Sequence, residues 1–126
     1  MSLRSPLGRV LGLGSAKEGT GHWWGQRVSA AALVLLGLWF AVSLALLHIE
    51  HYDDVIAYIA MPVHSVLLIL LCATMAYHSW LGVQVVIEDY IHGPVAKIAL
   101  LTLSRFAHVF VAVASIYAIL RIGITA

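Results

Sequence analysis

Charged residues are scarce in this chain and unevenly placed. Only 10% of its 126 residues are Asp, Glu, Lys or Arg, whereas a soluble domain contains about 25%. Residues 28–47 and 55–87 contain none of the four types, and residues 98–120 contain a single one, Arg105. A helix needs roughly 20 apolar residues to cross a bilayer. The sequence therefore predicts three transmembrane helices and leaves too little chain for a separate soluble catalytic domain.

Cysteine is almost absent as well. Cys72 is the only one, which excludes a disulfide within the chain, and a lone cysteine in an apolar stretch typically behaves as a small hydrophobe. Residues 1–26 lack the apolar core that a cleaved signal peptide requires. We therefore expect the first apolar stretch to remain in the membrane as a helix.

The basic residues indicate how the chain is oriented. Those that precede the first apolar stretch are Arg4, Arg9, Lys17 and Arg27. The first loop, from His48 to Asp54, contains acidic residues but no Lys or Arg. Because segments rich in Lys and Arg stay on the cytoplasmic side, the sequence predicts a multi-pass membrane protein with its N-terminus in the cytoplasm.

The expected fold class is all-α. Residues 1–26, rich in glycine and basic residues, form a cytoplasmic tail, and residues 27–126 form a three-helix transmembrane anchor. Pro62 removes one backbone donor and can bend or start a helix. Because lipid offers no partners to polar groups at membrane depth, we expect this anchor to be half of a heterodimeric helical bundle. The helices are predicted at about residues 26–48, 54–89 and 94–121.

Three of the seven histidines lie within the predicted spans, namely His64, His78 and His108. An ionisable side chain at membrane depth suggests a function, and the alternative is a histidine that only bonds to a neighbouring helix. His64 and His78 are 14 residues apart, or about 21 Å along a helix, so one haem cannot use both. Two haems would need two further histidine ligands on a facing helix, and the third span contains only His108. This argues against a self-contained two-haem cytochrome. The roles of His64, His108 and Arg105 stay open.

His78 has the surroundings that best suit a ligand. Gly82 follows one turn later on the same helix face, so a flat molecule can approach the backbone there. A neutral imidazole is a good axial ligand for haem iron. Asp89 shares the face about 16 Å further along, beside Tyr90, whose phenol can donate a hydrogen bond to a quinone carbonyl. The alternative for Asp89 and Tyr90 is an ordinary helix end with an aromatic anchor.

The segment from His78 to Tyr90 carries a family resemblance. Its sequence, HSWLGVQVVIEDY, resembles the pattern His-Ala/Ser-Trp-x-Gly-x-x-x-Val-x-x-Asp-Tyr of the small hydrophobic membrane anchor of succinate dehydrogenase (respiratory complex II). The run from Gly14 to Val28, GSAKEGTGHWWGQRV, is similar to the same anchor in alphaproteobacteria. The resemblance implies an anchor in the bacterial inner (plasma) membrane that serves the respiratory chain and the tricarboxylic acid cycle and is not catalytic on its own.

The resemblance implies roles for five residues. His78 corresponds to an axial ligand of haem b, with the second ligand on the other anchor subunit. Tyr90 corresponds to the tyrosine that hydrogen-bonds ubiquinone, and Asp89 to its acidic neighbour. Arg27 corresponds to a basic residue near the haem propionates. His22 corresponds to a histidine on the propionate side, at a spacing of five residues from Arg27.

The resemblance also implies partners. They are a second, cytochrome b556-type membrane anchor subunit, an iron–sulfur subunit and a flavoprotein subunit, with FAD and the iron–sulfur clusters held only by these partners. Ubiquinone and the lipid bilayer are expected to bind, and no nucleic acid. Two alternatives remain open. One is a cytochrome b-type anchor of another quinone-linked dehydrogenase or of fumarate reductase, and the other is a structural or assembly protein whose histidines only join helices.

Overall fold

The described part of the chain folds into three long helices and one short helix. The computed structural model describes residue 10 and residues 19–47 and 51–125. In these parts there is no strand, so the all-α prediction is confirmed. All three long helices are long and apolar enough to cross a membrane, as predicted. The helices are α2 (Gly19–Leu46), α3 (Tyr52–Ala60), α4 (Pro62–Tyr90) and α5 (Pro94–Thr125).

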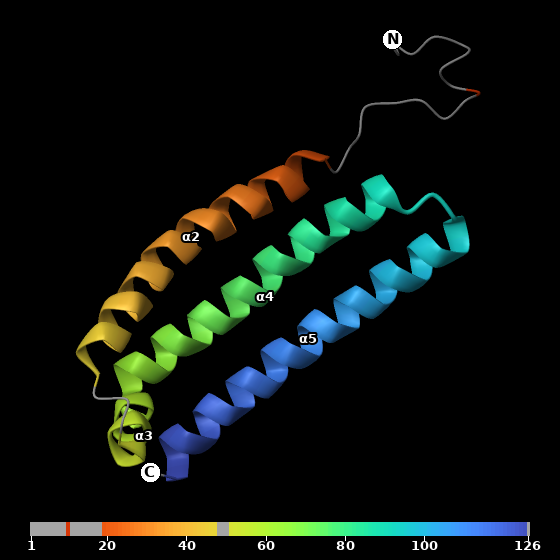
Figure 1. Ribbon diagram of the computed structural model, residues 1–126. Coiled ribbons are helices and arrows are strands. Elements are labelled where there is room, and N and C mark those ends of the chain that lie inside the picture. Colours follow the sequence, from red (N-terminus) through yellow and green to blue (C-terminus); the bar gives the residue numbers. More distant parts are fainter. Residues whose placement is uncertain (1–9, 11–18, 48–50, 126) are drawn as a thin grey trace.

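The three long helices lie side by side in one layer, with α4 in the middle (Figure 1). Helix α4 packs against both α2 and α5, whereas no Cα atoms of the described parts of α2 and α5 lie within 8 Å of each other. A layer of this kind has two open faces, which lipid or other chains must cover. The only buried residues among those described are Ser29, Leu71, Leu81 and Ile119.

The predicted second helix is divided between α3 and α4. Met61 has an extended backbone, with φ −62° and ψ 126°, as the residue before a proline prefers. The carbonyl of Tyr58 loses its usual helical donor, because the proline four positions later has no N–H. Nδ1 of His64 donates to this oxygen at 3.0 Å, and the Ser65 hydroxyl donates to the carbonyl oxygen of the next residue, Ile59. These side chains satisfy backbone groups that lipid cannot, which explains how the break is tolerated.

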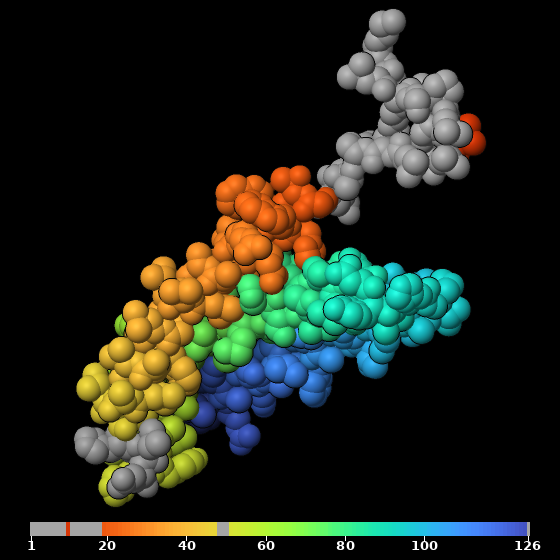
Figure 2. Space-filling model, turned by 45° about the horizontal axis from the view of Figure 1, so that its top comes forward, coloured from red at the N-terminus to blue at the C-terminus, as the bar shows by residue number. Residues whose placement is uncertain are grey.

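The loop between α4 and α5 projects from one end of the layer. The cyan end of α4 and this loop extend beyond the orange start of α2 (Figures 1 and 2). Helix α5 begins with Pro94, a favoured residue for a first helical position. Nζ of Lys97 donates to the carbonyl oxygen of Glu88 at 2.8 Å and ties the two helix ends together. Asp89 and Tyr90 therefore stand at an end of the layer that α2 does not cover.

Candidate functional site

His78 is held in place by Ser29 on the neighbouring helix α2. Nδ1 of His78 lies 2.8 Å from the Ser29 hydroxyl, and this hydroxyl donates to the Gly25 carbonyl oxygen at 2.7 Å. A serine hydroxyl carries a single hydrogen. The tautomer that completes both contacts therefore has its hydrogen on Nδ1, which donates to Ser29. Nε2 of His78 then keeps its lone pair, which is the form of imidazole that binds a metal.

The other two transmembrane histidines have contacts that account for them within this chain. His108 donates from Nδ1 to the Ser104 carbonyl oxygen of its own helix at 2.7 Å and accepts at Nε2 from the Ser79 hydroxyl at 3.1 Å, so both ring nitrogens are occupied and Nε2 joins α5 to α4. His64 donates to the Tyr58 carbonyl oxygen at the break between α3 and α4. Its ring stacks on Tyr58 with 3.9 Å between the ring centroids. His64, like His78, keeps a lone pair on Nε2, so it is the uncovered backbone at Gly82, one turn from His78, that favours His78 as the ligand.

The surroundings of His78 on its α2 side fit a ligand that carries polar groups. A Cβ built on Gly82 would meet only Nε2 of Gln26, at 3.9 Å, so the backbone of α4 is uncovered one turn from His78. His22, Gln26 and Ser29 follow each other at spacings of four and three and so share one stripe of α2. Nε2 of His22 and Oε1 of Gln26 are buried without a hydrogen-bond partner. The unpaired Nε2 of His22, which can donate to a carboxylate, and the open backbone at Gly82 suit a haem with its propionates.

Arg27 lies away from this stripe. Its side chain is exposed, and its guanidinium carbon is 5.8 Å from the centroid of the Trp23 ring. Arg27 precedes Ser29 by two positions, which turns it about 160° round the helix, so it points away from α4. Contact between Arg27 and a haem beside His78 requires the guanidinium to leave Trp23.

Asp89 and Tyr90 lie in the last turn of α4. Asp89 follows His78 by eleven positions, which places it about 20° round the helix and about 16 Å along it, so both residues share one face. Tyr90 is 76% exposed. The described part of the chain therefore covers little of the Tyr90 side chain. A ligand bound to the Tyr90 hydroxyl would also contact neighbouring chains or lipid.

Sequence reasoning missed Ser29 and Gln26. Ser29 is a small residue of the kind that lets membrane helices approach closely, and its type alone indicates no contact with a histidine. The available signal was the spacing of polar residues at positions 22, 26 and 29 at the start of an apolar helix, which marks one helix face. The contact with His78 now assigns this face to the interface with α4.

Comparison with known proteins identifies the family. The sequence model of the family of succinate dehydrogenase/fumarate reductase transmembrane subunits matches residues 1–120. The chain belongs to this family. The succinate dehydrogenase hydrophobic membrane anchor subunit of Paracoccus denitrificans is 33% identical over 122 residues, which cover 97% of this chain and 94% of that protein. The corresponding subunit of Rickettsia bellii is 36% identical over 88 residues, 70% of each chain. The resemblance inferred from the sequence is confirmed.

Membership of the succinate dehydrogenase anchor family establishes the coarse function. The chain is a membrane anchor with helices suited to several membrane passes, and it works together with other subunits of the enzyme. This membership does not support the alternative of a structural or assembly protein whose histidines only join helices. The haem ligand and the quinone contacts remain proposals.

Proposed function

We propose that this chain anchors a succinate-oxidising complex to the bacterial inner membrane, with its N-terminus in the cytoplasm. In this proposal it provides one axial ligand to a haem b and part of a ubiquinone-reduction site. The observation that carries the proposal is the contact between Ser29 and His78, which fixes an imidazole within an apolar span and leaves its Nε2 free. Family membership supports the enzyme to which the site belongs.

The haem site is half a site in this chain. His78 would supply one ligand of a haem that is shared between two chains. A cytochrome b-type partner anchor on the open His78 face would bring the second ligand and complete the bundle. His22 and Gln26 would bind propionate oxygens, with Arg27 joining them after leaving Trp23. A haem held there would supply the transfer of single electrons.

The quinone site draws on the exposed end of α4. Tyr90 would donate a hydrogen bond to a ubiquinone carbonyl oxygen and stabilise the negative charge that grows on it as electrons arrive. Asp89 would orient the phenol or relay protons from water at the cytoplasmic surface. Two electrons and two protons convert the quinone to the quinol. The electrons come from an iron–sulfur subunit, and succinate oxidation by FAD takes place in the flavoprotein subunit.

Purification of the complex in mild detergent tests this proposal. We expect the chain to copurify with a second anchor, an iron–sulfur subunit and a flavin-containing subunit, and a pyridine haemochrome assay to detect haem b. A complex without haem would contradict the ligand assignment. A haem-containing complex without flavin would favour the anchor of another quinone-linked dehydrogenase, and faster fumarate reduction than succinate oxidation would favour a fumarate reductase.

Replacing Ser29 tests the contact that carries the proposal. Ser29→Ala removes the acceptor for Nδ1–H of His78, and loss of such a supporting bond typically weakens metal binding about 10- to 100-fold. We expect lower haem retention and a higher midpoint potential, because an imidazole that no longer donates its N–H stabilises oxidised iron less well. Redox titration of the purified complex measures the potential.

Two further variants serve as controls for Ser29→Ala. Ser29→Thr keeps a hydroxyl that can make the same bonds, so it is expected to restore both haem retention and potential. Ser43→Ala makes the same change elsewhere in α2 and is expected to leave both unchanged. A potential that does not differ between Ser29→Ala and the unaltered complex would rule out this role for the hydroxyl.

A further inference from the structure

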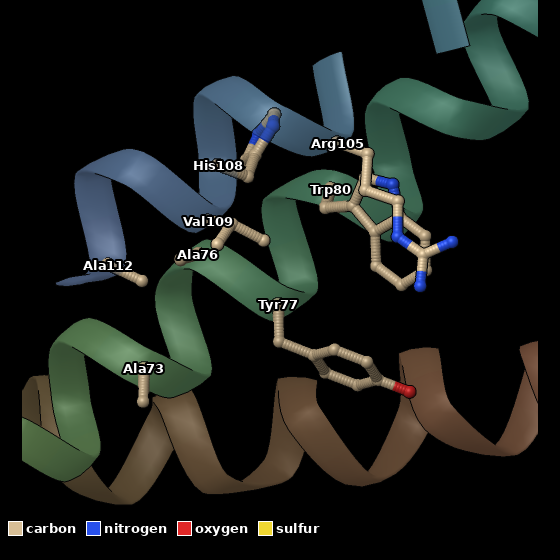
Figure 3. A pocket seen from close by; sticks show the side chains of 8 residues that line it. All are labelled: Ala73, Ala76, Tyr77, Trp80, Arg105, His108, Val109 and Ala112. Atoms are coloured by element: carbon tan, nitrogen blue, oxygen red, sulfur yellow. The ribbon is translucent and has the colours of Figure 1, made fainter. Parts of the chain in front are cut away.

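A groove between α4 and α5 lies on the side of α4 that points away from His78 and α2. It has a volume of about 260 Å³. Trp80 and Arg105 stand together at one end of it, and Ala73 and Ala112 lie at the other (Figure 3). Trp80 follows His78 by two positions, or about 200° round the helix. The groove is therefore separate from the proposed haem face.

Arg105 brings a positive charge to this groove, and the neighbouring spans offer it no counter-charge. Residues 55–87 and 98–120 contain no Asp or Glu. The nearest carboxylate along α4, on Glu88, is eight positions beyond Trp80, or about 12 Å along the helix. The guanidinium carbon of Arg105 lies 5.4 Å from the centroid of the Trp80 ring, a contact that attracts the cation but does not neutralise it.

The depth of Arg105 favours an anion from outside this chain as its partner. Arg105 follows the first residue of α5, Pro94, by eleven positions, or about 16 Å along the axis. Ionisable groups at such depth are rare and are found paired, because an isolated charge in the hydrocarbon is costly. A long arginine side chain can also extend several ångströms towards the membrane surface. Arg105 can therefore meet an anion that enters from the surface at the α4–α5 loop.

The shape of the groove favours a phospholipid as the source of that anion. Ala73 lies seven positions before Trp80 and Ala112 seven after Arg105, so the groove continues for about 10 Å from the cation towards the membrane centre. Its far end is lined by alanine, whose small side chain leaves room for an acyl chain. The cation thus lies nearer the surface and the apolar floor lies deeper, which is the order of phosphate and acyl chain in a lipid.

We propose that this groove, lined by Ala73, Trp80, Arg105 and Ala112, binds a phospholipid with its phosphate on Arg105 and one acyl chain along the alanines. A partner anchor is expected on the side of α4 that carries His78, because it has to reach that residue. That placement of the partner rests on the proposed haem ligation, whereas the lipid site itself does not.

Photo-crosslinking of a lipid probe to the assembled complex tests the proposal. The probe is phosphatidylglycerol with a diazirine in its acyl chain, added to phosphatidylcholine nanodiscs that contain the complex. We expect crosslinked peptides of α4 and α5 around Ala73 and Ala112. Arg105→Gln is expected to lower their yield about fivefold or more, and Arg105→Lys to keep most of it. Arg121→Gln, the matched change at the far end of α5, is expected to leave the yield unchanged.

A second variant separates occupation of the groove from attraction by charge. Ala112→Leu fills the apolar end while Arg105 stays in place, and it is expected to lower the yield as well. An unchanged yield in both Arg105→Gln and Ala112→Leu would overturn the proposal, as would crosslinks from this face to a protein subunit in place of lipid. Haem content is expected to stay unchanged in these variants, so loss of lipid binding with haem retained is distinct from failure of the haem assignment.

Discussion

The His78→Ala complex is expected to lose haem b. The substitution removes the ligand that this chain would provide, so the haem would be held by the partner anchor alone. The pyridine haemochrome assay, scaled to the amount of purified complex, measures the loss. Any haem that remains is expected to show an altered absorption spectrum. A bis-imidazole spectrum of unchanged shape and intensity would disprove the ligand assignment.

His108→Ala is the matched control for this experiment. It removes the same side chain from a neighbouring helix at a comparable depth, together with its contacts to Ser79 and Ser104. Hydrogen bonds between membrane helices are worth about 1 kcal/mol each, so we expect a lower melting temperature with an unchanged haem spectrum. If both variants lost haem equally, the cause would be a general folding defect and not a missing ligand.

The spans could be predicted from the sequence because hydropathy is a local property of each apolar run. The break at Met61 could be predicted only in part. Pro62 marks the position, but whether a proline bends or ends a helix depends on how the freed carbonyl of Tyr58 is satisfied. In the structure His64 does this from six positions away, across the break. Such a contact leaves no periodic pattern in the sequence.

The candidate site, like the break at Met61, could be predicted from the sequence only in part. Helical periodicity places His78 and Asp89 on one face of α4, because both belong to a single helix. The pairing of His78 with Ser29 depends on how α2 is turned against α4, and no pattern within one helix contains that rotation. The same rotation places Arg27 on the far side of α2. Its expected closeness to a haem came from position in a family motif, which does not report the direction of the side chain.

Tyr90→Phe is expected to lower the rate of ubiquinone reduction about 5- to 150-fold, since loss of one hydrogen bond at a site that the bound quinone desolvates costs about 1–3 kcal/mol. Succinate oxidation with an artificial soluble acceptor is expected to remain unchanged, because that reaction takes place in the flavoprotein and iron–sulfur subunits. The two rates measured on the same preparation therefore separate the quinone site from the rest of the enzyme.

Tyr52→Phe provides the control for Tyr90→Phe. Both tyrosines are 76% exposed, but Tyr52 begins α3 at the opposite end of the layer from Tyr90. A general effect of removing an exposed phenol would lower quinone reduction in both variants, whereas a hydrogen bond to the quinone predicts the loss only for Tyr90→Phe. Equal loss of both reactions in Tyr90→Phe would indicate a damaged complex. Unchanged quinone reduction would show that the Tyr90 hydroxyl makes no essential bond to the substrate.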